Sequence, residues 1–90
     1  MAEQAVELSP RAMRDLRQLH VGDAERVLDD LRVLKQTPWP GPPKVKKLRG
    51  HDLFRLRTGH YRSVFEAWEG KGVVLRIVDR KEFDRILRAL

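Results

Sequence analysis

Basic residues are concentrated in one stretch, from Lys44 to Arg62, which reads KVKKLRGHDLFRLRTGHYR. The stretch holds seven Lys or Arg residues against one acid, Asp52, and so carries the full net charge of +6 of the 90-residue chain. Everything outside it is formally neutral. Guanidinium and ammonium groups gathered in this way attract polyanions, and the phosphates of a nucleic acid are the first candidate.

Arg55 and Arg57 are the best placed of these cations. They alternate with apolar residues such as Leu56, a pattern typical of a strand with one buried and one exposed face. Side chains two residues apart in a strand point to the same side, about 7 Å apart, which is near the phosphate spacing of a single nucleic-acid strand. The pattern therefore indicates a phosphate-binding face. The alternative is an exposed sheet face on which both arginines pair with Glu66 or Glu69.

Histidines supply the candidate proton carriers. His51 and His60 flank the basic strand, and histidine side chains titrate near neutrality. The alternative is that both are exposed turn residues. His20 is expected at a helix end, and three histidines this far apart, in a chain without cysteine, make no recognisable metal motif. No metal or cofactor is expected.

Composition limits the chain to one small folded domain, residues 1–90. Hydrophobic residues make up 41% and charged residues 36% of the chain, a balance that favours a folded protein with a charged surface. Its apolar runs are far shorter than the roughly 20 residues of a membrane span, and the first residues lack the features of a signal peptide. The sequence therefore predicts a cytoplasmic protein without membrane association.

The arginines need a sheet to present them, and the first half of the chain predicts one strand and two helices. Residues 4–8 alternate as a strand, and Ser9, followed by proline, is typical of a helix N-terminus. Apolar residues recur at helical spacing over 11–19 and, after Asp23 as the expected N-cap, as far as Leu34. The short connection predicts an antiparallel helical hairpin.

A stiff loop separates this hairpin from the rest of the sheet. Residues 36–43, QTPWPGPP, are too rich in proline for a helix or a central strand. Trp39 is expected to cap the edge of the core rather than to stack on a base. Tyr61 and Phe65 are likewise expected in the core.

The second half of the chain predicts an antiparallel meander and a last helix. Turn residues separate three alternating segments, at 53–58, 61–68 and 73–78. Asp79 can then cap a helix over 80–90. The order β-α-α-β-β-β-α favours an α+β fold, with a small antiparallel sheet and the helical hairpin packed on one face.

Three motifs occur in a fixed order, LRG at 48–50, LFRLR at 53–57 and GHYR at 59–62, and Arg80 follows them. This ordered set resembles the RelE/ParE superfamily of type II toxins across nearly the whole chain. The resemblance implies a small twisted antiparallel sheet with helices on one side. It also implies a toxin that is encoded beside an antitoxin, which wraps and neutralises it.

In the RelE branch the toxin enters the ribosomal decoding site and cuts messenger RNA. The resemblance therefore implies that four arginines bind the RNA backbone and stabilise the transition state, because they match the basic positions of the family's cleavage site: Arg55, Arg57, Arg62 and Arg80. Attack of a 2′-hydroxyl on the adjacent phosphate also needs a base and an acid, roles that arginine fills poorly. Further RNA binding is expected from Lys44, Lys46, Lys47, Arg49 and His60, with the lysines in a loop of no defined geometry.

Two features depart from the family pattern. Many relatives carry lysine where this chain has Arg55 or Arg57, and a tyrosine that follows the late arginine gives way here to Phe83 and Asp84. These departures keep open a ParE-like inhibitor of DNA gyrase, and a non-catalytic nucleic-acid-binding module is a third alternative. Arg80 can also form an ion pair with Asp84, four residues further along a helix.

The favoured interpretation is a ribosome-dependent endoribonuclease that needs no cofactor. Its expected partners are the ribosome, messenger RNA and an acidic antitoxin that folds as it binds over the hairpin and the sheet. The toxin itself is expected as a monomer or within a toxin-antitoxin hetero-oligomer.

Overall fold

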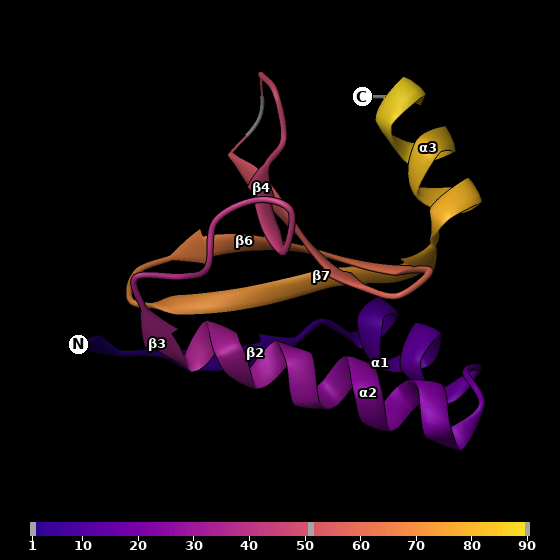
Figure 1. Cartoon of the computed structure of the whole chain (residues 1–90), viewed down its shortest axis with the longest axis horizontal. Coiled ribbons are helices and arrows are strands. Elements are labelled where there is room, and N and C mark those ends of the chain that lie inside the picture. Colours follow the sequence, from indigo (N-terminus) through magenta and orange to yellow (C-terminus); the bar gives the residue numbers. More distant parts are fainter. Residues whose placement is uncertain (1, 51, 90) are drawn as a thin grey trace.

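The computed structural model describes residues 2–50 and 52–89, so the candidate proton carrier His51 lies outside the described residues. A five-stranded sheet separates two helical layers (Figure 1). In chain order the elements are β1 (Ala2–Glu3), β2 (Ala5–Leu8), α1 (Pro10–Arg17), α2 (Val21–Leu31), the 3-10 helix η1 (Arg32–Lys35), β3 (Gln36–Thr37), β4 (Val45–Lys47), β5 (Leu53–Thr58), β6 (Tyr61–Trp68), β7 (Lys71–Asp79) and α3 (Arg80–Ala89). The predicted α+β class and the predicted order of its main elements are confirmed.

The sheet has the strand order β2-β7-β6-β5-β4, and the expectation that it is antiparallel throughout was wrong. β4 to β7 are antiparallel neighbours, but β2 pairs with β7 in parallel, so the sheet is mixed. Alternation predicts a strand without its direction, and a parallel pair requires a long connection, which here is the whole segment from α1 to β6. The helices also lie on both sides of the sheet, since α3 packs on the face opposite to the hairpin (Figure 1).

The ends of the predicted helices need two corrections. α2 begins at Val21 after His20, which makes no side-chain capping bond, so Asp23 is a first-turn residue and not the N-cap. An acid there still favours the helix through the helix dipole. The periodic pattern up to Leu34 is also not one helix, because α2 ends at Leu31 and continues as η1.

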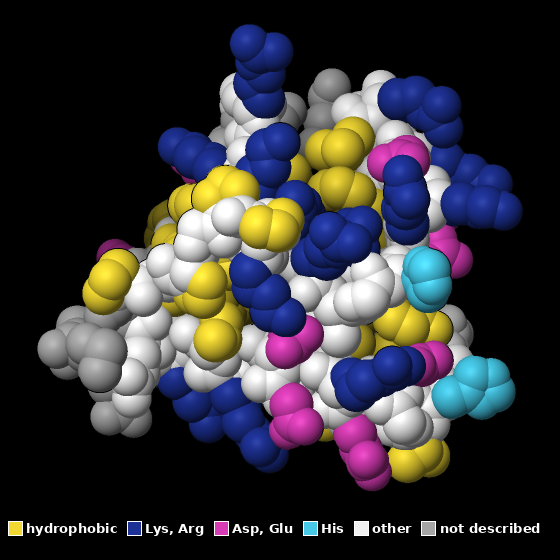
Figure 2. Space-filling view, in the orientation of Figure 1, with side chains coloured by type: hydrophobic (Ala, Val, Ile, Leu, Met, Phe, Trp, Pro, Cys, Tyr) yellow, Lys and Arg dark blue, Asp and Glu magenta, His cyan; other side chains and the backbone are white. Residues whose placement is uncertain are grey.

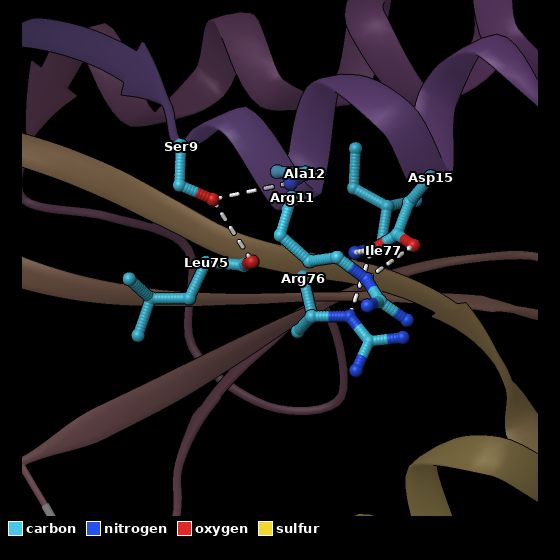
Figure 3. Close-up of polar contacts among 7 residues, drawn as sticks. All are labelled: Ser9, Arg11, Ala12, Asp15, Leu75, Arg76 and Ile77. Carbon is cyan, nitrogen blue, oxygen red and sulfur yellow. Dashed lines mark hydrogen bonds and ion pairs between the residues drawn. The ribbon is translucent and has the colours of Figure 1, made fainter.

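Ser9 caps α1 as predicted and also fixes this helix to the sheet (Figure 3). Its hydroxyl accepts the N–H of Ala12 at 3.1 Å and donates to the carbonyl of Leu75 at 3.0 Å. Asp15, which is only 8% exposed, accepts the backbone N–H of Ile77 at 3.0 Å and Nε of Arg76 at 2.9 Å. α1 therefore covers the part of β7 that extends beyond β2.

The larger core lies between the sheet and the hairpin, around the fully buried Phe65, Leu56 and Leu34. Trp39 packs edge-on against Phe54 and Phe65, with ring centroids 5.4 and 5.3 Å away, and its Nε1 donates to the Leu34 carbonyl. The predicted core-edge place of Trp39 and the core place of Phe65 are confirmed. No helix in the described part of the chain is long and apolar enough to span a bilayer.

The smaller core lies under α3. Phe83 packs there against Val64 and Val78 of the sheet and Leu48 of the β4–β5 connection. Asp79 caps α3 as predicted, because its side chain accepts the backbone N–H of Glu82 at 2.8 Å. This packing places the start of α3 beside the strands that carry the basic residues.

Candidate nucleic-acid interface

Three of the predicted arginines share one face of the sheet. Arg57 and Arg62 stand directly opposite each other on β5 and β6, and Arg55 stands opposite Val64. Residues opposite each other in an antiparallel pair project to the same side. Since Val64 packs under α3, these arginines lie on the α3 side of the sheet, away from the hairpin.

Arg80 approaches the same region from the start of α3. It follows Val78, the β7 partner of Arg62, by two positions. Burial lowers the pKa of Arg62, and the positive charges of Arg55, Arg57 and Arg80 lower it further. Burial and the charge of Arg57 likewise lower the pKa of Arg55. Arg62 therefore lies within reach of the charges of the other three, and the four residues are called the arginine cluster below.

Backbone carbonyls hold two members of the arginine cluster. Arg55 donates from Nη1 to the carbonyl of Pro43 at 2.6 Å. Arg62 donates from Nη1 to the carbonyls of Gly59 and Tyr61, at 2.9 and 3.0 Å. A carbonyl orients a guanidinium without cancelling its charge, and the remaining N–H groups of the fork suit phosphate oxygens.

Pairing of the cluster with acids, the alternative considered above, does not occur within residues 2–50 and 52–89. None of the ion pairs found there includes a member of the arginine cluster. Glu66 stands opposite Leu53 instead. Asp84 acts on the cluster at longer range, since its charge raises the pKa of Arg62 against the effect of the cations. The cluster keeps its positive potential.

A groove of about 950 Å³ runs beside the cluster, between the β4–β5 connection and α3. Its lining combines cations with apolar side chains and one acid: Lys46, Lys47, Leu48, Arg49, Gly50, Asp52, Arg55, Phe83 and Leu87. Arg55 belongs to both the groove and the cluster. Figure 2 shows this part of the surface, where Lys and Arg side chains surround a hydrophobic patch.

The predicted lysines are better ordered than the sequence suggested. Lys46 and Lys47 belong to β4, which pairs with β5, and the expectation of a loop without defined geometry was wrong. Three residues with two lysines are too short and too polar to show an alternating pattern. Lys44 precedes β4 and forms an ion pair with Asp30 of α2 at 2.7 Å. Its ammonium is therefore shared with an acid.

His60 lies exposed in the turn between β5 and β6. It lines another pocket of about 280 Å³, together with Asp23 and Arg26 of α2 and Tyr61 of β6. Tyr61 is half-buried against the larger core, and its hydroxyl donates to Asp23 at 3.1 Å. The described residues hold no group of three side chains suited to a metal ion.

Two acids on α2 make contacts that were not predicted from the sequence. Asp30 accepts the hydroxyl of Thr58 at 2.7 Å, and Asp23 pairs with Arg26 as well as with Tyr61. From the sequence, Asp23 was expected only as the N-cap of the helix, and no contact was expected for Asp30. The available signal was their spacing of seven residues, which places them on the same side of a helix, two turns apart.

Comparisons with known proteins agree with this geometry. The family described as the ParE toxin of the type II toxin-antitoxin system, parDE, matches residues 6–82. A relative from Methanocaldococcus jannaschii named as toxin RelE1 is 28% identical over 80 residues, which cover 86% of this chain and 89% of the relative.

Two solved structures are also similar. The archaeal RelE-RelB complex from Pyrococcus horikoshii contains a chain that matches with a TM-score of 0.75 and 25% identity, over 87% of this chain and 96% of that one. The toxin-antitoxin complex RelBE2 from Mycobacterium tuberculosis contains one with a TM-score of 0.74 and 26% identity, over 89% and 94%. With the match over residues 6–82, the chain belongs to the ParE toxin family of type II toxin-antitoxin systems, within the RelE/ParE superfamily.

Proposed function

We propose that this toxin is a ribosome-dependent endoribonuclease that cuts messenger RNA and so inhibits translation. The observation that carries the proposal is the arginine cluster, in which residues of β5, β6 and α3 bring positive charge together without forming ion pairs in the described part of the chain. Guanidinium groups held in advance at one place suit the negative charge that grows on a phosphodiester in the transition state.

The proposed reaction is attack of a ribose 2′-hydroxyl on the adjacent phosphate. The hydroxyl loses its proton, the new bond to phosphorus forms, and the bond to the departing 5′ oxygen breaks as that oxygen takes up a proton. Arg57 and Arg62 would contact the non-bridging oxygens of the phosphate. Arg80 would stabilise the negative charge that grows on the phosphate in the transition state. His60 is the candidate proton carrier, because it lies in the turn whose Gly59 carbonyl holds Arg62.

The proposed partner is an acidic antitoxin. Both similar solved structures are complexes of a toxin with its antitoxin. The groove beside the arginine cluster offers Lys46, Lys47 and Arg49 together with apolar side chains, which suits an acidic segment that also carries apolar residues. Such a segment would compete with RNA for Arg55. We place this toxin, with the ribosome as its target, in the cytoplasm.

The second candidate is inhibition of DNA gyrase. The match to the ParE toxin family favours it, as does Phe83, which stands where RelE-like chains are expected to carry a tyrosine and packs in the smaller core. A gyrase inhibitor needs no base or acid. The two candidates therefore differ in whether messages are cut.

Induction of the toxin in growing cells, followed by mapping of RNA 5′ ends, tests the proposal. We expect cuts at fixed positions within codons of translated messages. Replacing Arg57 or Arg62 by alanine should lower the cutting rate about 10²-fold, which is typical of losing one donor to a transition-state oxyanion. The matched control is Arg17→Ala, which removes an exposed cation from α1 on the other side of the sheet.

Intact messages with a loss of plasmid supercoiling would overturn the proposal in favour of gyrase. The proposal would also be overturned if a variant with all four residues of the arginine cluster replaced by alanine cut messages as fast as the parent.

A further inference from the structure

The turn between β5 and β6 holds Arg62 in place. This turn consists of Gly59 and His60, and the flanking residues Thr58 and Tyr61 stand opposite each other. Arg62 folds back over it and donates from Nη1 to the carbonyls of Gly59 and Tyr61, at 2.9 and 3.0 Å. The direction of the guanidinium therefore depends on where these two carbonyls lie.

The turn has little packing of its own. Gly59 and His60 are both exposed, and Gly59 has a φ of +57°, in the left-handed region that glycine adopts without strain. An exposed two-residue turn with such a glycine is free to shift unless its ends are fixed. What fixes the ends lies on the other face of the sheet.

α2 holds both ends of the turn through two carboxylates. Asp30 accepts the hydroxyl of Thr58 at 2.7 Å, before the turn, and Asp23 accepts the hydroxyl of Tyr61 at 3.1 Å, after it. The two acids are seven residues apart, so two helical turns separate them on the same side of α2. The distance between them along the helix, about 10 Å, lets each reach one strand of the hairpin.

Each carboxylate is itself held by a cation. Arg26 pairs with Asp23, and Lys44 pairs with Asp30 at 2.7 Å. The hydrogen bond from Arg26 is the main reason that the pKa of Asp23 lies below its usual value. Burial and the bond to Asp23 raise the pKa of Tyr61, which keeps its hydroxyl protonated as a donor. Both bonds to the turn are therefore made by fixed, charged acceptors.

We propose that Asp23, Asp30, Thr58 and Tyr61 form a brace by which α2 positions Arg62 for catalysis from the opposite face of the sheet. The inference rests on the proposed function, because it assigns a role in the same RNA-cutting site. The four are positioning residues, since their side chains act on Arg62 only by holding the backbone whose carbonyls bind it. Loosening the brace leaves the charge of the arginine cluster intact but lets the guanidinium of Arg62 move away from the reacting phosphate.

The variants Tyr61→Phe and Thr58→Val remove the two hydroxyl donors and keep the size of each side chain. In cleavage of messenger RNA on programmed ribosomes, we expect the double variant to lower kcat about 10-fold to 100-fold, since small misplacements of a catalytic group have effects of this size. KM should stay within about twofold, because the cationic surface is unchanged. Thr58→Ser, combined with the native Tyr61, should restore kcat since the hydroxyl returns.

The matched control for the brace variants removes a side-chain interaction between two other strands. Lys71→Ala breaks the ion pair with Glu7 at 3.4 Å, between β2 and β7, and should leave kcat unchanged. The side-chain ¹⁵N signals of Arg62 give a readout that needs no activity. We expect slow rotation of its guanidinium in the parent and faster rotation in each single variant, so the test stands even if the double variant unfolds.

The outcomes separate this inference from the proposed function. If Arg62→Ala cuts messages as fast as the parent, the proposed role of the arginine cluster fails. If Arg62→Ala is inactive while the brace variants keep the parent's kcat and the parent's Arg62 dynamics, the brace is overturned and the proposed function stands.

Discussion

Asp15 shows how one buried carboxylate can fix a helix to a strand edge. It receives the N–H of Ile77 and the Nε of Arg76, and Arg11 lies 3.5 Å away (Figure 3). Replacing Asp15 by alanine leaves a buried N–H and a half-buried guanidinium without their acceptor. We expect the free energy of unfolding to fall by about 2 to 4 kcal/mol, as measured by urea denaturation.

Asp15→Asn is the matched control, because its amide oxygen can still accept one of these bonds. Its loss of stability should be clearly smaller than that of Asp15→Ala. Equal losses would mean that charge, rather than the acceptor at the strand edge, is what matters at this position.

Asp23 gives the protein a pH dependence in the acid range. Its pKa is lowered in the folded state, chiefly by the hydrogen bond from Arg26. A lowered pKa contributes stability that is complete above the pKa of the unfolded chain, about 3.9, and is lost as the pH falls through the folded value. The difference in unfolding free energy between the parent and Asp23→Asn should therefore be constant above about pH 5 and shrink below pH 4.

Urea denaturation of both proteins across that range measures the difference. Asp29→Asn is a suitable control, because Asp29 is exposed on α2 and, within the described part of the chain, forms an ion pair only with the exposed Arg32. A parent-to-variant difference for Asp23→Asn that stays the same down to pH 2.5 would contradict the assignment.

At the scale of elements, the sequence predicted the strands that are marked by alternating apolar and polar residues and bounded by turn residues. β5 and β6 have the predicted bounds because their apolar and polar residues alternate between clear turns. β4 was missed since three residues cannot show a period, and β1 and β3 were missed for the same reason. The parallel pairing of β2 with β7 depends on the path of the whole chain, which no local pattern contains.

The candidate site, too, was predicted where a local pattern decides it and missed where it depends on the folded chain. That Arg55 and Arg57 share a face follows from their spacing alone. The place of Arg62 opposite Arg57 depends on the hairpin register, which a two-residue turn fixes. The hydrogen bonds of the α2 brace join residues up to 38 positions apart, so only the folded chain shows them.

Trp39 joins the proline-rich segment before β4 to the sheet. Its ring packs edge-on against Phe54 and Phe65, which are themselves stacked with centroids 5.5 Å apart. Trp39→Ala should lower the free energy of unfolding by about 3 kcal/mol, in the range for losing a large aromatic side chain from a core. Thermal or urea unfolding followed by circular dichroism measures this.

Trp68 offers the matched control, because its side chain at the end of β6 is 58% exposed. Trp68→Ala should change stability by less than about 1 kcal/mol, as for most exposed positions. Similar losses for the two variants would contradict the role of Trp39 as the contact that closes the core.

At the scale of the molecule, the sheet separates a hairpin side that carries both signs of charge from a side that carries the arginine cluster. The hairpin side carries the acids Asp23, Asp29 and Asp30, each of them paired with a cation. The α3 side carries the arginine cluster and the basic rim of the groove. A polyanion is therefore expected to approach from the α3 side, and its binding should depend on salt.

Salt dependence can count the phosphates that the arginine cluster contacts. For single-stranded RNA, the slope of log affinity against log salt falls by about 0.7 for each phosphate contact removed. Arg57→Ala with Arg62→Ala should therefore reduce the slope by about 1.4, whereas Arg14→Ala with Arg17→Ala, which removes the same charge from the exposed surface of α1, should leave it nearly unchanged. Fluorescence anisotropy with a short unstructured RNA measures both slopes. The two double variants have the same net charge and differ only in the side of the sheet from which the charge is removed. Equal reductions of the slope would therefore mean that RNA responds to net charge and makes no specific contact with the arginine cluster.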